Sequence, residues 1–213
     1  MQWAVADGAI YPMFNPEIHA VQMKRNLTRI FIAGDFGIQN ATTFGIFGYY
    51  APEKRYHQIA SYYHNGREEG QKTVKEYVSD LKNFIRENMV MPEYIAIDPS
   101  AAPLRVELLK DEYFSRHNIR IIAAKNNVEI GIQMVSYLLN INKFTLDPSC
   151  IHDIEEFGSY VWDSDKLDKG KEEVVKINDH AMDKIRYALM TDTTIHRTFD
   201  RELKLFSGKG ARE

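Results

Sequence analysis

Two aspartates follow short apolar runs, where their carboxylates could support metal-dependent chemistry. Asp35 comes just after the run 29–33 (RIFIA), and Asp98 comes directly after the run 94–97 (YIAI). A carboxylate at the end of a buried strand is costly unless it is paired or bound to a cation. If the two runs are neighbouring strands of one sheet, Asp35 and Asp98 meet at an edge of the core. The alternative, an aspartate that serves only as a turn residue or helix cap, stays open for each.

A third aspartate, Asp183, lies in a predicted C-terminal helix with two further polar candidates. Asp179 is four residues before it and His180 is three residues before it, so the three side chains can share one helical face. A neutral His180 could ligate a metal, and a protonated one could contact a phosphate or assist a leaving group. The alternatives are that Asp179 caps the helix and that His180 only orients a carboxylate.

Carboxylates that converge without thiols form an oxygen-rich site. Such a site suits Mg²⁺ or Mn²⁺ rather than structural zinc, and a divalent cation removes the repulsion between like charges. Two ions about 3.5–4 Å apart can activate water and stabilise the leaving oxygen in phosphoryl transfer. We therefore expect two divalent ions, bridged by Asp35 because it sits on the central strand. The expected ligands are Asp35, Asp98 and Asp183, with Asp179 and His180 as further candidates, and the expected catalytic residues are Asp35, Asp98, Asp183 and His180.

The elements that would position these residues follow from the hydrophobic pattern. Runs rich in β-branched and aromatic residues predict three antiparallel strands, at 29–33, 42–50 and 55–63. Short apolar runs predict two more strands, at 94–97 and 119–123. Apolar residues at three- and four-residue steps predict helices, at 74–89, 101–116, 128–139, 150–161 and 178–190. A charged loop is expected over 163–175.

This order of elements predicts the α/β class, with a mixed sheet of three antiparallel strands plus parallel strands, flanked by helices. The domain itself is expected to span residues 29–192. Residues 1–28 are expected to form an N-terminal lead-in segment packed on that domain. Residues 193–213 are expected to form a C-terminal tail.

The bulk properties bound the class of protein. A length of 213 residues, with 44% hydrophobic and 27% charged residues, suits one soluble domain with a core of ordinary size. No apolar run is long enough to cross a bilayer, and no signal peptide is visible. The single cysteine, Cys150, indicates a reducing compartment and is expected to be buried. A net charge of −3 argues against a basic surface that grips nucleic acid, so such binding would rely on metal and on a more basic partner domain.

Other catalytic motifs are incomplete. Asp35, Phe36 and Gly37 match the kinase DFG triplet, but no Gly-rich loop, kinase lysine motif or HRD loop accompanies them. The phosphate-binding loop Gly-x4-Gly-Lys-Ser/Thr and the metalloprotease HExxH are both missing. An actin-like nucleotide-binding module stays an alternative, because Asp35 and Gly37 fit its first Asp-x-Gly turn, although no second glycine turn follows. A non-catalytic assembly module that docks through its helices is another.

Five short motifs come in a definite order along the chain. They are Asp-Gly-Ala-Ile-Tyr at 7–11, Gly-Asp-Phe-Gly at 34–37, Ile-Asp-Pro-Ser-Ala-Ala at 97–102, Tyr-Val-Trp-Asp at 160–163, and Asn-Asp-His-Ala-Met-Asp-Lys-Ile-Arg-Tyr-Ala at 178–188. Together they resemble the C-terminal nuclease domain of bacteriophage large terminase subunits. The last motif is the most specific, and the resemblance covers most of the chain.

The resemblance implies a ribonuclease-H-like fold and a metal-dependent endonuclease for concatemeric double-stranded viral DNA, which leaves 5′-phosphate and 3′-hydroxyl ends. Asp35 matches the first-strand catalytic aspartate, Asp98 the second and Asp183 the helical third. His180 matches an accessory histidine near the metals, and Asp179 has a less settled role. The resemblance also implies an ATPase domain in the full-length protein, a small terminase subunit and a portal as partners, and the host cytoplasm as location. The main enzyme alternative is another ribonuclease-H-like nuclease, such as a resolvase or transposase core.

Overall fold

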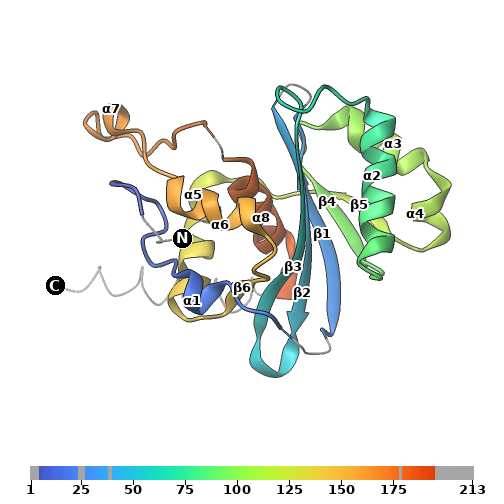
Figure 1. The fold of residues 1–213 in the computed structure, drawn as a ribbon, viewed down its shortest axis with the longest axis horizontal. Helices are drawn as coiled ribbons and strands as arrows, with labels where there is room; N and C mark the ends of the chain where they lie inside the picture. Colours follow the sequence, from blue (N-terminus) through green and yellow to red (C-terminus); the bar gives the residue numbers. More distant parts are fainter. Residues whose placement is uncertain (1–4, 24–26, 38–39, 178, 195–213) are drawn as a thin grey trace, which may run out of the picture.

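A six-stranded mixed sheet divides the molecule into two layers of helices (Figure 1). The computed structural model describes residues 5–23, 27–37, 40–177 and 179–194. The strand order across the sheet is β5-β4-β1-β2-β3-β6. The strands are β1 (Arg29–Asp35), β2 (Ala41–Tyr50), β3 (Arg55–Asn65), β4 (Tyr94–Ile97), β5 (Arg120–Ala123) and β6 (Phe144–Leu146).

The strands combine an antiparallel meander with parallel pairs. β1 pairs with β2, and β2 with β3, in antiparallel register, whereas β1–β4, β4–β5 and β3–β6 are parallel. This arrangement confirms the predicted α/β fold with a mixed sheet. Because β1 and β4 run in the same direction, with Gly34 opposite Ile97, both strands end at one edge of the sheet.

The two faces of the sheet bury separate cores. One face packs against α2 (Val74–Glu87), α3 (Ala102–Lys110) and α4 (Glu112–Arg116), and the other against α5 (Val128–Asn140), α6 (Ile151–Ser159), α8 (His180–Thr191) and the short α1 (Pro16–His19) (Figure 1). β1 contributes to both cores. Phe31 and Ala33 face the core on the side of α5, α6 and α8, and Ile32 faces the core on the side of α2, α3 and α4. This alternation is the period of a strand buried on both sides.

Two helices show how local sequence builds the layers. α2 begins with a capping box in which Thr73 and Glu76 satisfy each other's backbone N–H groups, and its apolar side chains then face the sheet. α8 is buried on nearly all sides, which is typical of a central helix. Gly131 of α5 allows the close approach to α8, because a β-carbon there would lie 2.8 Å from the sulfur of Met190.

The sequence predictions missed four short elements and one break. One of the four is the 3₁₀ helix η1 (Ala51–Glu53), between β2 and β3. β6 lies outside every predicted strand because its three residues gain their pairing from the edge of β3. The predicted loop 163–175 contains α7 (Ser164–Leu167), whose start is capped by the Asp163 side chain. The predicted helix 101–116 is divided at Asp111, whose extended backbone ends α3 and caps α4. α1 was not expected either.

The chain termini differ in how far they are described. In the N-terminal segment, Tyr11 and Phe14 are buried in the core beside α6. The expected tail at 193–213 lies outside the described residues except for residues 193 and 194. Within the described parts of the chain, every helix is too short or too polar to span a membrane.

Candidate metal centre

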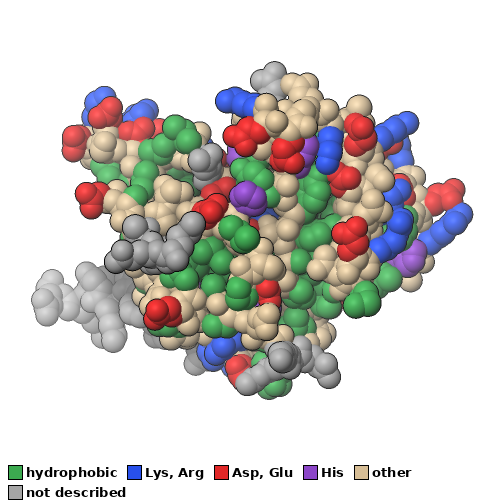
Figure 2. Space-filling view, viewed as in Figure 1, with side chains coloured by type: hydrophobic (Ala, Val, Ile, Leu, Met, Phe, Trp, Pro, Cys, Tyr) green, Lys and Arg blue, Asp and Glu red, His purple; other side chains and the backbone are tan. Residues whose placement is uncertain are grey.

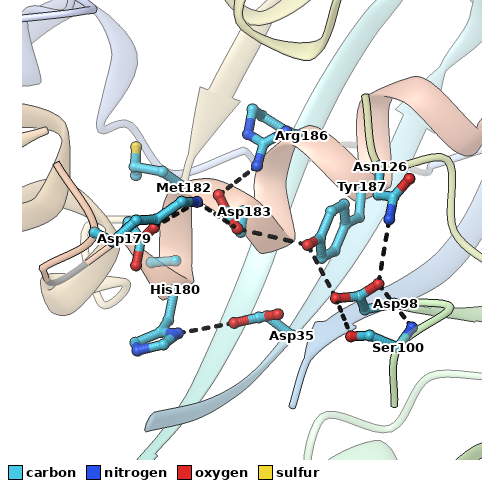
Figure 3. Close-up of polar contacts among 12 residues, drawn as sticks. Asp35, Asp98, Ser100, Asn126, Asp179, His180, Met182, Asp183, Arg186 and Tyr187 are labelled. Atoms are coloured by element: carbon cyan, nitrogen blue, oxygen red, sulfur yellow. Dashed lines mark hydrogen bonds and ion pairs between the residues drawn. The ribbon is translucent and has the colours of Figure 1, made fainter. Parts of the chain in front are cut away.

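Three elements bring the predicted aspartates to one end of the sheet (Figure 3). Asp35 is the last residue of β1, Asp98 directly follows β4, and Asp183 lies in the first turn of α8. The Asp98 backbone N–H donates to the Gly34 carbonyl over 3.4 Å, which continues the β1–β4 pairing to the site. The Thr43 hydroxyl of β2 donates to the His180 carbonyl over 3.2 Å and fixes the start of α8 against the sheet.

Asp35 is the most buried of the three carboxylates that the sequence singled out. Its exposed fraction is 9%, and its Oδ2 lies 2.8 Å from Nδ1 of His180. Burial raises the pKa of Asp35, the hydrogen bond from His180 opposes the shift, and the charges of Asp183 and Asp98 add to it. Burial alone would lower the pKa of His180, but the hydrogen bond with Asp35 and the charges of Asp35, Asp179 and Glu156 together outweigh it and raise that pKa. Because an ionised carboxylate can only accept, Nδ1 of His180 is the donor in this contact.

Asp183 is held by a buried arginine. The Arg186 guanidinium, one turn along α8, donates to Oδ1 of Asp183 and is only 1% exposed. The other oxygen, Oδ2, lies 3.8 Å from Nζ of Lys176 and 3.5 Å from the hydroxyl of Tyr187. Arg186 thus fixes the orientation of Asp183 and compensates its charge, while Oδ2 stays directed towards the other carboxylates (Figure 3).

Asp98 is linked to Asp183 through Tyr187. The Tyr187 hydroxyl lies 3.3 Å from Oδ2 of Asp98, so one phenol bridges carboxylates from β4 and α8. Ser100 donates its hydroxyl to Oδ2 of Asp98 and its backbone N–H to Oδ1, over 2.7 and 3.1 Å. Burial raises the pKa of Tyr187 far above its usual range, with added effects of Asp183 and Asp35, so the phenol stays protonated. The sequence analysis missed Tyr187, although its place one turn after Asp183 was a usable signal.

Asp179 occupies the cap position of α8, but its side chain does not cap the helix. Its carboxylate pairs with Lys176 over 3.0 Å. The helix is capped instead by Glu156 of α6, which accepts the backbone N–H groups of Ala181 and Met182 over 2.7 and 3.3 Å. The capping alternative for Asp179 is therefore wrong. Nothing in the local sequence of α8 could have revealed Glu156, since it comes from a distant helix.

A pocket of about 390 Å³ opens over the start of α8. Its walls include Asp35, Asp179, His180 and Asp183, whereas Asp98 lies outside the lining. Other polar side chains on the walls come from the β1–β2 connection, the end of β3, the β3–α2 connection and the segment before α8, namely Asn40, Asn65, Arg67 and Lys176. The four predicted residues on the walls thus share one solvent-accessible space, and Tyr187 connects that space to Asp98.

The donor set fits a hard divalent cation. Asp35, Asp98 and Asp183 could supply oxygen ligands without a thiol. The repulsion from Asp183 and Asp98 adds to the burial that raises the pKa of Asp35, and a cation would relieve that repulsion. Across the described ranges, no three Asp, Glu, His or Cys side chains already form a metal-coordinating group. The acceptor oxygens instead receive hydrogen bonds from His180, Arg186 and other donors of the chain. Ligation would therefore require side-chain adjustments without a change of fold.

Comparisons with known proteins agree with this arrangement. The family described as "Terminase RNAseH like domain" matches residues 35–191. The large terminase of a thermophilic bacteriophage, solved in complex with ADP, is 33% identical and superposes with a TM-score of 0.78, covering 91% of this chain and 47% of that one. The chain thus spans about half the length of that ADP-bound terminase. No curated protein matches.

Two isolated nuclease domains share the fold at lower identity. The large terminase nuclease domain of bacteriophage SPP1, with bound Mn, is 20% identical with a TM-score of 0.56, covering 81% of this chain and 88% of that one. The large terminase nuclease of thermophilic phage G20c, with bound magnesium, is 14% identical with a TM-score of 0.59. The match covers 86% of this chain and 97% of that one. With the family match over residues 35–191 and the ADP-bound relative, these likenesses lead to one conclusion: the chain belongs to the terminase ribonuclease-H-like domain family.

Proposed function

We propose that this chain is the metal-dependent endonuclease domain of a phage DNA-packaging terminase, which hydrolyses phosphodiester bonds of double-stranded concatemeric DNA. The observation that carries the proposal is the meeting of Asp35, Asp98 and Asp183 at one end of the sheet, in a chain of this family. Their pocket is open to solvent on the side of Asp35 and Asp183, where a DNA strand could approach.

The cofactors in this proposal are two divalent ions, Mg²⁺ or Mn²⁺. Asp35, Asp98 and Asp183 would hold them, with Asp179 and His180 as further candidates. Related nuclease domains were solved with Mn and with magnesium, which supports the use of divalent ions. Such ions supply Lewis-acid stabilisation of the phosphodiester and of its leaving oxygen.

The chain's own residues would prepare the site. His180 holds a proton at Nδ1 against Asp35 and so fixes one oxygen of that carboxylate. Arg186 fixes one oxygen of Asp183, and Tyr187 sets the separation of Asp183 from Asp98. We assign His180 an accessory role, in which it orients Asp35 and also lines the pocket where the phosphate would lie. The carboxylates would therefore be oriented before substrate arrives, which is how preorganised sites lower a barrier.

The proposed reaction is direct attack of water on phosphorus, without a covalent enzyme intermediate. In keeping with the family resemblance, the products would carry 5′-phosphate and 3′-hydroxyl ends. DNA ligase should therefore reseal the nicks without prior end repair. A need for end repair before ligation would contradict this part of the proposal.

The proposed partners follow from the length of the relatives and from the family resemblance. The ADP-bound terminase is about twice as long as the part of it matched here. We propose that an ATPase domain accompanies this chain in the full-length protein, and that a small terminase subunit and a portal are its partners in the host cytoplasm. An ATPase partner with basic surface would also compensate for the net charge of −3.

Nicking of supercoiled plasmid tests the proposed function. We expect the wild-type chain to nick and linearise plasmid in Mn²⁺ or Mg²⁺ and to lose this activity in EDTA. Asp35→Asn should abolish nicking without altering the circular dichroism spectrum. A folded wild-type chain that leaves plasmid intact in both metals, or an unaffected Asp35→Asn variant, would overturn the proposal.

A further inference from the structure

Two basic side chains line the acidic pocket. Arg67 belongs to the connection between β3 and α2, and Lys176 lies in the segment just before α8. Both line the same space as Asp35, Asp179 and Asp183. The pocket therefore combines a set of carboxylates with two cations that come from separate parts of the chain.

Arg67 is the more unusual of the two cations. Its side chain is exposed, and among the described residues its guanidinium has no hydrogen-bond or ion-pair partner, although it lines a pocket with three aspartates. Its backbone is nevertheless fixed, because the Arg67 N–H donates to Oδ1 of Asn65 over 3.1 Å. The same turn is closed by Glu69, whose carboxylate accepts the Asn65 N–H over 2.8 Å. A fixed turn that carries an unpaired guanidinium is suited to an external anion.

Lys176 complements Arg67 from the segment before α8. Its Nζ lies 3.0 Å from Oδ2 of Asp179 and 3.8 Å from Oδ2 of Asp183, while its side chain is 60% exposed. An exposed ion pair of this kind contributes little to stability. The ammonium group can therefore turn from Asp179 to a phosphate oxygen at low cost, without leaving the pocket.

The charge of the molecule explains why such cations would be needed. The net charge is −3, and on the face shown in Figure 2 basic and acidic side chains are interspersed rather than separated by sign. A DNA strand that enters the pocket meets Asp35, Asp179 and Asp183, which repel its phosphates. Local cations on the walls oppose this repulsion where it is strongest.

We propose that Arg67 and Lys176 form a phosphate clamp that binds a DNA backbone phosphate next to the scissile bond. Arg67 would contact two non-bridging oxygens through its planar guanidinium, and Lys176 would act as a second, compact charge on the same phosphate. The neutral side chains of Asn40 and Asn65 line the same walls and offer further donors. The clamp rests on the proposed nuclease function, since it supplies the substrate contacts of that same pocket.

Binding to a short DNA duplex tests the clamp independently of cleavage. Fluorescence anisotropy in EDTA, over a series of KCl concentrations, gives the affinity and its dependence on salt. Each lost phosphate contact should reduce the slope of log K against log salt by about 0.9. Because both side chains contact one phosphate, we expect Arg67→Gln and Lys176→Gln each to reduce the slope by part of this amount, with an affinity about tenfold lower at the lowest salt.

Two further variants separate the clamp from general electrostatics. Arg67→Lys keeps the charge, so it should retain the salt slope while losing part of the affinity that the planar guanidinium provides. Arg116→Gln removes the same charge from an exposed arginine on α4, on the opposite side of the sheet, and should leave binding unchanged (Figure 1). Circular dichroism confirms that each variant is folded.

The outcomes distinguish the clamp from the nuclease function. If Arg67→Gln and Lys176→Gln bind like Arg116→Gln while wild type nicks plasmid, the clamp is wrong and the nuclease proposal stands. If the two variants show a reduced slope of log K against log salt but wild type does not nick plasmid in either metal, the clamp stands as a DNA contact and the nuclease proposal is wrong. Equal losses in all three variants would overturn the clamp, because they would reflect net charge alone.

Discussion

The two ends of α8 both carry buried carboxylates, but the surroundings of these carboxylates differ. At the C-terminal end, Asp192 is 1% exposed and receives hydrogen bonds from Tyr56 and Tyr94 over 2.9 and 3.0 Å. Nη1 of Arg29 lies 3.1 Å from the same carboxylate. The chain thus supplies one counter-charge and two phenols to a single acid, and both carboxylate oxygens are satisfied without any external group.

At the N-terminal end, several acids share their donors. Asp35, Asp179 and Asp183 line one open pocket, and their nearest donors are His180, Arg186, Lys176 and Tyr187. Lys176 is exposed and shared between two carboxylates. A carboxylate that the chain satisfies completely is structural, whereas carboxylates that converge on an open pocket have acceptor capacity left for a ligand. Burial alone does not separate the two kinds; the opening to solvent and the sharing of Lys176 and Tyr187 between acids do.

The largest expected effect is the loss of cleavage in Asp35→Asn. Metal stabilisation of the transition state contributes several kcal/mol, so removal of this proposed ligand should lower the nicking rate by about 10³-fold or more. Asp192→Asn, at the other end of the helix, should change the nicking rate far less at a temperature where it is folded. Initial rates of plasmid nicking in Mn²⁺ for both variants make the comparison.

Metal binding offers a second way to measure the difference between Asp35 and Asp192. Saturating Mn²⁺ should raise the Tm of wild type and of Asp192→Asn, because a ligand that binds only the folded state stabilises it. Asp35→Asn should show a much smaller shift. An equal Mn²⁺ shift in Asp35→Asn would remove Asp35 from the metal site, whatever its effect on rate.

The second effect in size is the loss of stability in Asp192→Asn. Breaking a buried charge pair by removing one partner costs about 3 kcal/mol, which corresponds to a fall in Tm of roughly 6–12 °C for a chain of this size. Tyr56→Phe removes only one hydrogen bond from the same cluster and should cost about 1 kcal/mol. Thermal melting by circular dichroism gives both values. If Asp192→Asn melts like wild type, the contacts of Asp192 with Arg29, Tyr56 and Tyr94 do not hold α8 to the sheet. Asp192 would then not be the structural counterpart of the acids at the other end of the helix.

The sequence could predict the acids of the site better than their partners. Asp35 and Asp98 stood out because each follows a short apolar strand, and Asp183 because its spacing from His180 and Asp179 is helical. The parallel pairing of β1 and β4 then brings the first two together as expected. Such signals are local, so they survive in a single sequence.

The partners around these acids and around the start of α8 had no comparable signal. Glu156 reaches α8 from α6, and Arg67 reaches the pocket from the β3–α2 connection. Arg186 was visible only as a charged residue in a helix, where a solvent-exposed position is the usual expectation; its burial follows from the packing of α5 on α8. Partners of this kind depend on tertiary packing, which periodicity does not encode.

The third prediction concerns Glu156, the structural acid at the N-terminal end of α8. Glu156→Ala leaves the N–H groups of Ala181 and Met182 without their acceptor, which should cost about 1–3 kcal/mol and loosen the turn that carries His180. Glu156→Gln keeps a side-chain oxygen as acceptor and should retain most of the stability and activity. Urea unfolding and nicking rates are the measurements. If the alanine and glutamine variants behave alike, the cap is not what positions the first turn.

The smallest expected effect separates the roles of His180. Because its Nδ1 donates to Asp35, we expect His180 to orient that carboxylate, and loss of such a supporting hydrogen bond typically costs about tenfold in activity or metal affinity. His180→Ala should therefore lower nicking by about tenfold in Mg²⁺ and in Mn²⁺ alike. A direct ligand would behave differently, since imidazole suits Mn²⁺ better than Mg²⁺, and the loss would be larger with Mn²⁺. Calorimetric Mn²⁺ titration beside nicking assays in each metal distinguishes these cases, with the exposed His117→Ala on the far side of the sheet as control. If His180→Ala retains full activity in both metals, with unchanged Mn²⁺ binding, the Asp35–His180 contact is only structural, like the contacts of Asp192 at the other end of the helix.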